Sequence, residues 1–590
     1  MKKRWICQQL PDPAVVEQFA SKLSIEKPLA SLLLQRGINT VEAANAFFNP
    51  DINMLHDPFL MKDMDKAVKR LSTAIINNEK ILVYGDYDVD GTSAVALLYS
   101  FLCEIIGTNY KQLVEFYIPD RYLEGYGISD QGIEYCKENN INLLISLDCG
   151  IKANDKVAQA AEYGIDVIIC DHHLEGDELP PAVAILDPKR KDWPYPYKEL
   201  SGCGVGFKLI QGYCQHYKLP DQLWLSRMDL VAISIASDIV AITGENRILA
   251  HFGLEIINKF PHVGIKSILD QAGIKLHFPF KEETIFSRVI SISDLVFYVG
   301  PRINAAGRMK SGRESVRLFI SEDEDKSADI GKRINTQNEQ RKELDRNATE
   351  EAIHMIRDSH EYINRKSIVV YNPTWFKGII GIVASRLVEE FYKPTIVLTK
   401  SSDGLITGSA RSVKEFNIYD GIDYCSDLLE HFGGHKFAAG LSMKEENLEE
   451  FIEKFEQYVH DNLEERSIIP EISVDMPLDL SDITHSFLNN LKRFAPFGPG
   501  NMEPIFQSRG VVDEGVGRIV GDKHLKCRVL YPDRPVQPID AIAFNMKDKL
   551  AIIQDNKPFD LLYHVEENVW NNTVNIQLNV KDMRPCGTAE

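Results

Sequence analysis

The stretch KILVYGDYDVDGTSAVALLYSFL, residues 80–102, carries the strongest structural signal in this chain. The apolar run ILVY leads into three aspartates at alternate positions, Asp86, Asp88 and Asp90, and then into an apolar segment with helical spacing. LVEFYIP, NLLISLD and DVIICD are further short apolar runs, with helical segments between them. Short buried strands that alternate with helices predict a parallel sheet with right-handed crossovers.

The three alternating carboxylates repel one another unless a cation lies among them. The pattern D-x-D-x-D-G matches the first half of a calcium-binding EF-hand loop, in which position 12 is a glutamate. That position is Leu97 here, and the preceding element is a strand, so we reject the EF-hand. The alternative is a ligand cluster at the carboxyl ends of parallel strands, where open α/β sheets form their sites.

Three further segments obey the same rule and end in metal-binding side chains. LLISLDCG ends in Asp148, DVIICDHH ends in Asp171, His172 and His173, and LVAISIASDIV supplies Asp238 at a fourth expected strand tip. A single aspartate after a strand is ordinarily a cap or turn residue, but four such tips together predict a metal site. Carboxylates with imidazole suit Mn²⁺ or Mg²⁺, and this many ligands predicts two ions that hydrolyse a phosphodiester.

The composition predicts a globular protein of three or four domains, with 590 residues and a net charge of −20. This charge argues against a protein that coats nucleic acid indiscriminately, but it allows a basic active site. The ten cysteines are scattered without a C-x-x-C pair, which indicates reduced thiols in a cytoplasm. We expect no membrane contact, because no apolar run approaches about 20 residues and MKKRWICQQLPDP lacks the core of a signal peptide.

The composition and hydrophobic pattern of the sequence predict five regions. Residues 1–50 are expected to form short helices, and residues 51–320 form the first α/β domain. Residues 321–360 are polar, with a thin apolar stripe at Ile330, Ile334, Leu344 and Ala348, and predict a bridging helix on the order of 60 Å long. Residues 361–462 form a second α/β domain, and residues 463–590 an all-β barrel or sandwich.

GDYDVDG, SLDCG, DHH and IASDIV, in this order, resemble the motifs of the DHH phosphoesterase superfamily. IPDRYLEGYGIS, GPRINAAGRM, GIIGIVASRL, GSARSV, GGHKFAAG and FAPFGPGNMEPIF narrow the resemblance to the RecJ family of single-strand-specific 5′→3′ DNA exonucleases, over nearly the whole chain. The resemblance implies a DHH catalytic domain (51–320) and a DHHA1 substrate-binding domain (361–462), separated by a cleft, and an OB-fold (463–590).

The resemblance also assigns the site residues. It implies that a pair of Mn²⁺ or Mg²⁺ ions is held by Asp86, Asp88, Asp90, Asp148, His172 and Asp238, with His173 also in the catalytic set. We expect Asp88, Asp148, His172 and Asp238 to be direct ligands and Asp148 to bridge the ions. Asp171 and His173 are expected to orient their neighbours.

Substrate contacts are expected from cations and small residues of three further segments. Those with the family's pattern are Arg302, Asn304 and Arg308, with Gly307 for close approach, Ser409, Arg411 and Ser412, and Gly433, Gly434 and His435. Trp375 fits either a base-stacking or a core role, and Phe376 stands where the resemblance leads us to expect a histidine. In the last domain the candidate contacts are Lys523, His524, Lys526 and Arg528, although its many acidic residues fit an acidic, partner-facing surface equally well. The segment APFGPGN is interpreted as a rigid structural turn.

The function implied is removal of 5′-mononucleotides from single-stranded DNA in repair and recombination, by a cytoplasmic monomer. The expected partners are single-stranded DNA, a single-strand-binding protein and a helicase. Two alternatives remain. A DHH-family phosphodiesterase of short oligonucleotides or cyclic dinucleotides ordinarily lacks the N-terminal extension, bridge and β domain present here. A non-catalytic single-strand-binding relative would have lost ligands, whereas every motif aspartate and both histidines are present.

Overall fold

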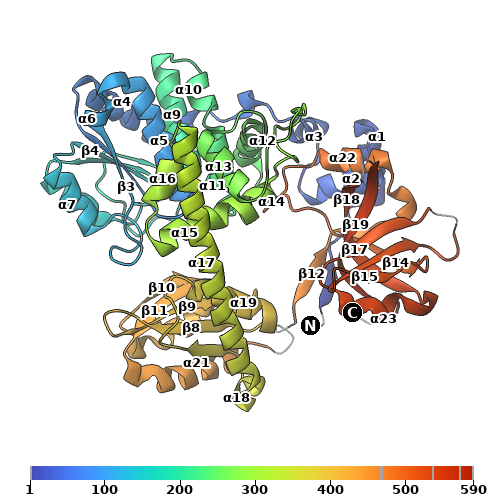
Figure 1. Ribbon diagram of the computed structural model, residues 1–590. Coiled ribbons are helices and arrows are strands. Elements are labelled where there is room, and N and C mark those ends of the chain that lie inside the picture. The colour runs from blue at the N-terminus through green and yellow to red at the C-terminus, as the bar shows by residue number, and fades with distance from the viewer. Residues whose placement is uncertain (1–2, 465–468, 535–536, 571–572, 588–590) are drawn as a thin grey trace.

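The chain folds into three lobes, in a computed structural model that describes residues 3–464, 469–534, 537–570 and 573–587. Two α/β lobes are joined along one long helix, and a β-barrel lies to their side with both ends of the chain close to it (Figure 1). The boundary that we expect between the second α/β domain and the β domain, at residues 462 and 463, lies next to residues 465–468. Those four residues are outside the part of the chain that the structure describes.

The first lobe contains a five-stranded parallel sheet with the strand order β3-β2-β4-β5-β6. Its strands are β2 (Ile81–Gly85), β3 (Val114–Tyr117), β4 (Leu143–Leu147), β5 (Asp166–Cys170) and β6 (Ala184–Leu186), the last of which we did not predict. Gly85 pairs with Leu147, and Leu147 with Cys170, so β2, β4 and β5 end in line. The residues that follow these three strands therefore emerge at one edge of the sheet.

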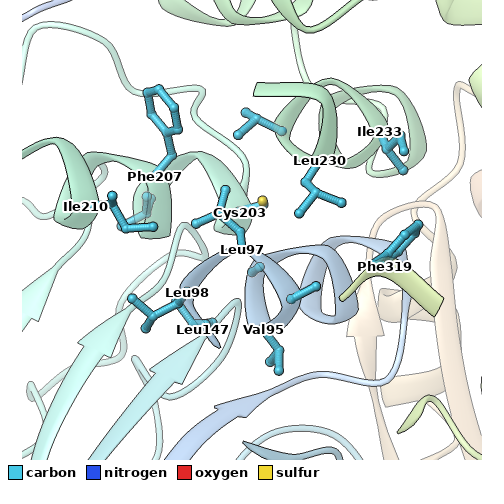
Figure 2. Packing of buried hydrophobic residues seen from close by; sticks show 14 of the residues in the cluster. Val95, Leu97, Leu98, Leu147, Cys203, Phe207, Ile210, Leu230, Ile233 and Phe319 are labelled. Atoms are coloured by element: carbon cyan, nitrogen blue, oxygen red, sulfur yellow. The ribbon is translucent and has the colours of Figure 1, made fainter. Parts of the chain in front are cut away.

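Helices cover both faces of this sheet. One face packs on α7 (Asp130–Glu138) and α8 (Asn154–Glu162), and the other on α4 (Met64–Ile76), α5 (Val89–Ile106) and α9 (Gly202–Tyr217). Figure 2 shows Leu97 of α5, Cys203 of α9 and Leu230 of α11 (Met228–Ser237) in one apolar core. Contrary to our expectation, Val89–Leu113 is long and apolar enough to cross a membrane, but 67% of its most apolar window is buried inside the protein.

The long helix α17 (Glu324–Arg357) has 34 residues, which gives about 51 Å at about 1.5 Å per residue. It packs on α13 (Val263–Gln271), α15 (Gly300–Met309) and α16 (Arg313–Phe319) at one end and on α19 (Ile380–Phe391) at the other. Ile334 and Ala348 of the predicted stripe are buried, whereas Leu344 is exposed. The helix therefore fixes the separation of the two α/β lobes.

The second lobe is a five-stranded mixed sheet with the order β10-β11-β9-β8-β7. The strands are β7 (Ile368–Tyr371), β8 (Thr395–Lys400), β9 (Ile406–Arg411), β10 (His431–His435) and β11 (Ala438–Met443). Only β7 and β8 are parallel among these described strands. The helices not yet placed include α6 (Tyr110–Leu113), α10 (Gln222–Leu225), α12 (Gly244–Lys259), α14 (Ile292–Asp294), α18 (His360–Asn364), α20 (Ile418–Asp423) and α21 (Leu448–Asn462).

The C-terminal lobe is a barrel, because β14 pairs with both β18 and β16 and so closes the sheet. Its elements are β13 (Met476–Pro477), α22 (His485–Lys492), β14 (Phe506–Asp513), β15 (Arg518–Val520), β16 (His524–Leu530), β17 (Ile539–Ala543), α23 (Leu550–Ile553), β18 (Phe559–Trp570) and β19 (Thr573–Pro585). This arrangement agrees with the all-β domain predicted for the end of the chain.

The N-terminal segment corrects our expectation of helices alone. Residues Arg4–Cys7 form β1, which pairs in parallel with β12 (Glu471–Val474). The helices α1 (Pro13–Leu23), α2 (Lys27–Gln35) and α3 (Val41–Phe48) do form, but they share an apolar core with the barrel. The two ends of the chain thus build one unit, which we call the terminal module (residues 3–49 and 469–587). A four-residue strand whose partner lies at the far end of the chain leaves no periodic signal.

Trp5 gives a test of the terminal module. Its ring is 2% exposed, its Nε1 donates to Asp582 Oδ2 at 2.9 Å, and the Arg584 guanidinium lies 4.0 Å above it. Trp5→Ala should destabilise the module by about 3–5 kcal/mol, since it opens a large cavity. Calorimetry should show one transition shifted to lower temperature, with a smaller shift for Trp5→Phe. An unchanged thermogram would mean that β1 is not part of the module.

Candidate active site

The aligned ends of β2, β4 and β5 bring three predicted aspartates to one edge of the sheet. Asp86, Asp148 and Asp171 follow these strands directly and are buried, with exposed fractions of 1–3%. Asp148 has a φ of +60°, and its amide donates to Cys170 O at 2.9 Å. Parallel strands of equal register therefore place the carboxylates together before any other element contributes.

Asp238 arrives by a different route from the one that we predicted. The apolar segment before it is helix α11, not a strand, and Asp238 caps the C-terminal end of that helix. The helix is buried on all sides, so its sequence shows no polar face and imitates a buried strand. The position of Asp238 near the site was anticipated, but its secondary structure was not.

The predicted ligands gather into groups whose donor atoms lie within 4.8 Å of one another. We call Asp86, Asp88 and Asp148 the β2 group, and Asp90, His172 and Asp238 the α11 group; Asp148, His172 and His173 form a third combination. His172 Nε2 lies 3.2 Å from Asp148 Oδ1, 3.6 Å from Asp238 Oδ2 and 3.9 Å from Asp90 Oδ2. The Asp148–His172 contact thus connects the two groups.

The donor set fits divalent cations. His172 Nδ1 lies 3.0 Å from Leu200 O, and a carbonyl only accepts, so Nδ1 carries the proton and Nε2 keeps its lone pair. His172 Nε2 and Asp86 Oδ1 are buried without a hydrogen-bond partner. Buried acceptors without donors are rare, and here they face further carboxylates. Mn²⁺ or Mg²⁺ is the partner that this oxygen-rich set with one imidazole accommodates.

Asp90 and Asp171 already have donors within the protein. Asp90 Oδ2 accepts from Gly202 N at 2.7 Å, and Oδ1 accepts from Cys203 N and Ser234 Oγ, also at 2.7 Å. The N-terminal end of α9 therefore holds Asp90, in the orientation that its dipole favours. A Cβ at Gly202 would lie 2.5 Å from Asp148 Cβ, so only glycine allows α9 to come this close.

Asp171 is bound on both oxygens. Its Oδ2 accepts from Ile151 N at 2.9 Å, and its Oδ1 lies 2.7 Å from both His172 N and His173 Nδ1. Burial alone would raise the pKa of Asp171, but the hydrogen bond and charge of His173 bring that pKa below its ordinary value. Asp171 thus orients the two histidines, and His173 also contacts the Tyr126 hydroxyl.

The other carboxylates repel one another. Burial, followed by the charges of neighbouring aspartates, raises the pKa of Asp86, Asp88 and Asp148. The same causes raise the pKa of Asp238 to about 8. A bound cation reverses this effect, because it favours the ionised form of every ligand.

A cluster of arginines lies between the two α/β lobes, and sequence reasoning missed its central member. Arg121 follows β3 and stacks 4.7 Å from the Tyr87 ring, and its charge opposes part of the rise that burial and Asp88 cause in the pKa of Asp86. Burial, then the charge of Arg121, lowers the pKa of Arg308 to about 10, and the same two causes lower that of Arg411. IPDRYLEGYGIS was part of the family resemblance, but one arginine after a strand carries no chemical signature.

The predicted residues of GPRINAAGRM divide between two roles. Arg308 lies in the arginine cluster and donates to Gly378 O of the second lobe at 3.2 Å. Arg302 instead donates to Asn335 Oδ1 of α17 at 2.9 Å and to Tyr298 O at 2.8 Å. Its donors therefore bind α15 to α17. Asn304 is half-buried, and a Cβ at Gly307 would lie 2.7 Å from Tyr87 O, so Gly307 permits a close helix contact.

The predicted residues of the second lobe lie in register across three strands. Ser409 pairs with Gly440 and Gly440 with Gly433, while Arg411 pairs with Ala438 and Ala438 with His435. Arg411 Nη1 donates to Ser409 Oγ at 3.1 Å. Ser412 Oγ instead donates to Phe416 O at 2.8 Å, and Gly434 has a φ of +150° beside Ala438 and Ala439.

The remaining candidates are placed as follows. Trp375 is buried, and its Nε1 donates to Glu351 Oε2 at 2.8 Å, as the core interpretation requires. Phe376 contacts Tyr122 of the first lobe, with ring centroids 6.1 Å apart. In the barrel, Arg528 forms ion pairs with Glu514 and Asp540, whereas Lys523 is exposed and His524 packs edge-on against Phe544.

The stability of the metal-free protein should depend on pH through Asp238. Its raised pKa means that the folded protein holds a proton that the unfolded chain releases, so stability falls as the pH rises toward 8. With EDTA, Asp238→Asn should raise the melting temperature at high pH and flatten its decline between about pH 4 and 8, the interval between the unfolded and folded pKa values. Mn²⁺ should stabilise the unsubstituted protein more than the variant.

The control for this measurement is Asp177→Asn, at an exposed site. It should leave the pH dependence unchanged. An Asp238→Asn protein that melts with the same pH profile as the unsubstituted protein would show that Asp238 is ionised like a surface aspartate.

Comparison with known proteins agrees with this geometry. Family models match at three places: the DHH family, N-terminal domain at residues 80–235, the DHHA1 domain at 364–461 and the RecJ OB domain at 474–582. A relative from Bacillus subtilis, the single-stranded-DNA-specific exonuclease RecJ, is 35% identical over 98% of this chain and 71% of its own length.

Solved structures show the same architecture. RecJ from Thermus thermophilus in complex with Mn²⁺ has a TM-score of 0.82 at 24% identity, covering 100% of this chain and 80% of that one. An exonuclease RecJ bound to manganese has a TM-score of 0.58 at 27% identity, covering 69% of this chain and 96% of that one. With its three domain matches in order and a RecJ relative aligned along nearly all of its length, this chain belongs to the RecJ family of DHH phosphoesterases.

Proposed function

We propose that this protein is a single-stranded-DNA-specific 5′→3′ exonuclease that releases 5′-mononucleotides with the help of two Mn²⁺ or Mg²⁺ ions. The observation that carries the proposal is the pairing of two acidic ligand groups, connected by the Asp148–His172 contact, with an arginine cluster beside them. Carboxylates alone would repel DNA. Metal ions held by these carboxylates, together with the arginines beside them, would give the phosphodiester a place to bind.

Each of the two ligand groups would hold one of the two ions that act on the phosphodiester. The β2 group would hold one ion and the α11 group the other, with Asp148 near both. Two bound ions supply an activated water and stabilise both oxygens of an in-line displacement. Asp171 keeps His172 and His173 oriented, and the proton on His172 Nδ1 leaves Nε2 available as a ligand.

The arginine cluster determines which end of the strand reacts. Burial and then the charge of Arg121 lower the pKa of Arg308 in the first lobe and of Arg411 in the second, so the three guanidinium groups lie close together, as a site for a phosphate dianion requires. A terminal 5′-phosphate held there would place the first phosphodiester at the carboxylates. The lobes meet where Tyr122 contacts Phe376, and this approach limits entry to one strand.

The same proposal includes the cellular compartment of the enzyme, the process in which it acts and its partners. All ten cysteines are free, which suits the reducing cytoplasm. The enzyme would act as a monomer in DNA repair and recombination. Its partners would be a single-strand-binding protein and a helicase. In the barrel, the exposed Lys523 and the pair His524 and Phe544 are candidate contacts to the trailing strand.

Labelled strands test the activity. With Mn²⁺, a 5′-labelled single strand should lose labelled mononucleotide at once, while a 3′-labelled strand shortens gradually and a blunt duplex persists. Asp148→Ala should reduce the rate by about 10²–10⁴-fold, since it removes several kcal/mol of metal-dependent stabilisation. A strand that stays whole but is retarded in a gel would instead support the single-strand-binding alternative.

Arg121→Gln tests the phosphate site. The loss of one charge-assisted hydrogen bond, about 1.5–3 kcal/mol, should weaken the binding of 5′-phosphorylated strands by about 10- to 100-fold and leave 5′-hydroxyl strands little affected. KM and kcat measured on both substrates give the comparison. Arg346→Gln, on the exposed side of α17, is the matched control. Equal losses on both substrates would assign Arg121 to another role.

A further inference from the structure

The segment Phe494–Asn501, FAPFGPGN, does more than connect α22 to β14. We call it the docking turn, because it lies against the loop that follows Asp238. Ile242 N donates to Pro499 O at 2.7 Å. A Cβ at Gly498 would lie 2.4 Å from Ile242 Cδ1, and a Cβ at Gly500 would lie 2.9 Å from Thr243 Cγ2. The turn and the loop therefore interlock without room for one additional methyl group.

The docking turn is fixed to the catalytic domain by an arginine that has no carboxylate partner among the described residues. Arg247 of α12 donates to Phe494 O at 2.8 Å, to Ala495 O at 2.9 Å and to Phe47 O at 3.0 Å. Asn501 Nδ2, which is buried, also donates to Phe494 O at 2.8 Å. Backbone carbonyls of α3 and of the docking turn thus converge on one guanidinium and join the terminal module to the catalytic domain.

Asp238 itself is weakly held. Its amide donates to Ser234 O at 2.9 Å, but its carboxylate accepts no hydrogen bond within the part of the chain that the structure describes. The next residue, Ile239, is 65% exposed and has a φ of +59°, a strained conformation for a β-branched side chain. Such strain persists only where the surroundings impose it. Further along the loop, Ala241 O accepts from the Tyr197 hydroxyl at 3.0 Å.

We propose that the docking turn positions Asp238, so that the terminal module sets the metal affinity of the α11 group and not that of the β2 group. Only four residues lead from Asp238 to Ile242, a span of at most about 14 Å, so a displaced loop moves the carboxylate. The β2 group depends instead on the ends of β2 and β4 and on the N-cap of α5, where Asp88 lies. Gly498 and Ile242 are therefore positioning residues. The inference rests on the proposed two-ion function.

Mn²⁺ titration of the DNA-free protein, by calorimetry and by the electron paramagnetic resonance of free Mn²⁺, tests this inference. Gly498→Ala should weaken one of two sites by about tenfold or more, the usual effect of losing a group that supports a ligand, and leave the other site unchanged. Ile242→Val removes the Cδ1 atom that the new methyl meets at 2.4 Å but keeps the Cγ1 position at 2.9 Å, so the double variant should recover part of the lost affinity.

Two further variants complete the design. Gly176→Ala adds the same methyl where the nearest atom is 3.7 Å away, and it should bind Mn²⁺ normally. Ile242→Ala removes the contact without a clash and should weaken the same site, which serves if Gly498→Ala does not fold. Unchanged affinity at both sites, or an equal loss at both sites in a folded variant, would overturn the inference. A wild-type protein that binds no Mn²⁺ would overturn the proposed function instead.

Discussion

Repulsion among buried carboxylates is the constraint on which this structure depends. The equal ends of β2, β4 and β5 bring Asp86, Asp148 and Asp171 to one edge, where water is largely excluded. Each carboxylate must then find a compensating charge or a set of donors. Asp171 has amides and a histidine, and Asp90 has the N-terminal end of α9. For Asp86 and Asp148, burial and the charges of neighbouring aspartates raise the pKa, and divalent cations would supply the compensating charge.

The same constraint explains the position of the arginines. Arg121 follows β3, on the same edge of the sheet, and its charge opposes part of the rise that burial and Asp88 cause in the pKa of Asp86. Arg411 reaches this edge from the second lobe only because α17 fixes where that lobe lies. Within α17, the fully buried Asp345 forms ion pairs with Arg341 and, at 2.8 Å, with Arg386 of α19. A removed partner would leave a buried charge, so this network keeps the lobes in one arrangement.

Most of the site could be predicted from the sequence, because most of its residues belong to local patterns. The residues that were missed depend on partners far away in the chain. Asp86, Asp148 and Asp171 directly follow short apolar runs, and the local hydrophobic pattern predicts where such strands end. Asp238 was expected at a strand because α11 is buried all round and shows no polar face. β1 was missed because its partner β12 lies more than 460 residues away, as the Arg4–Glu471 pair shows. Arg121 could not be predicted as a site residue, because its role depends on Arg308 and Arg411, which are distant in the sequence.

The two ligand groups therefore differ in what supports them. In the β2 group, Asp86 and Asp148 follow neighbouring strands of one sheet in register, and Asp88 caps the N-terminal end of α5. The α11 group adds a helix end whose next residue is strained and whose loop rests on the terminal module. That module contains the β1–β12 pair and is joined to α12 of the catalytic domain by Arg247. The barrel belongs to the same module as the docking turn, so a DNA strand bound to the barrel, as proposed above, would contact a unit that lies against the loop of Asp238, four residues of backbone from the proposed ligand.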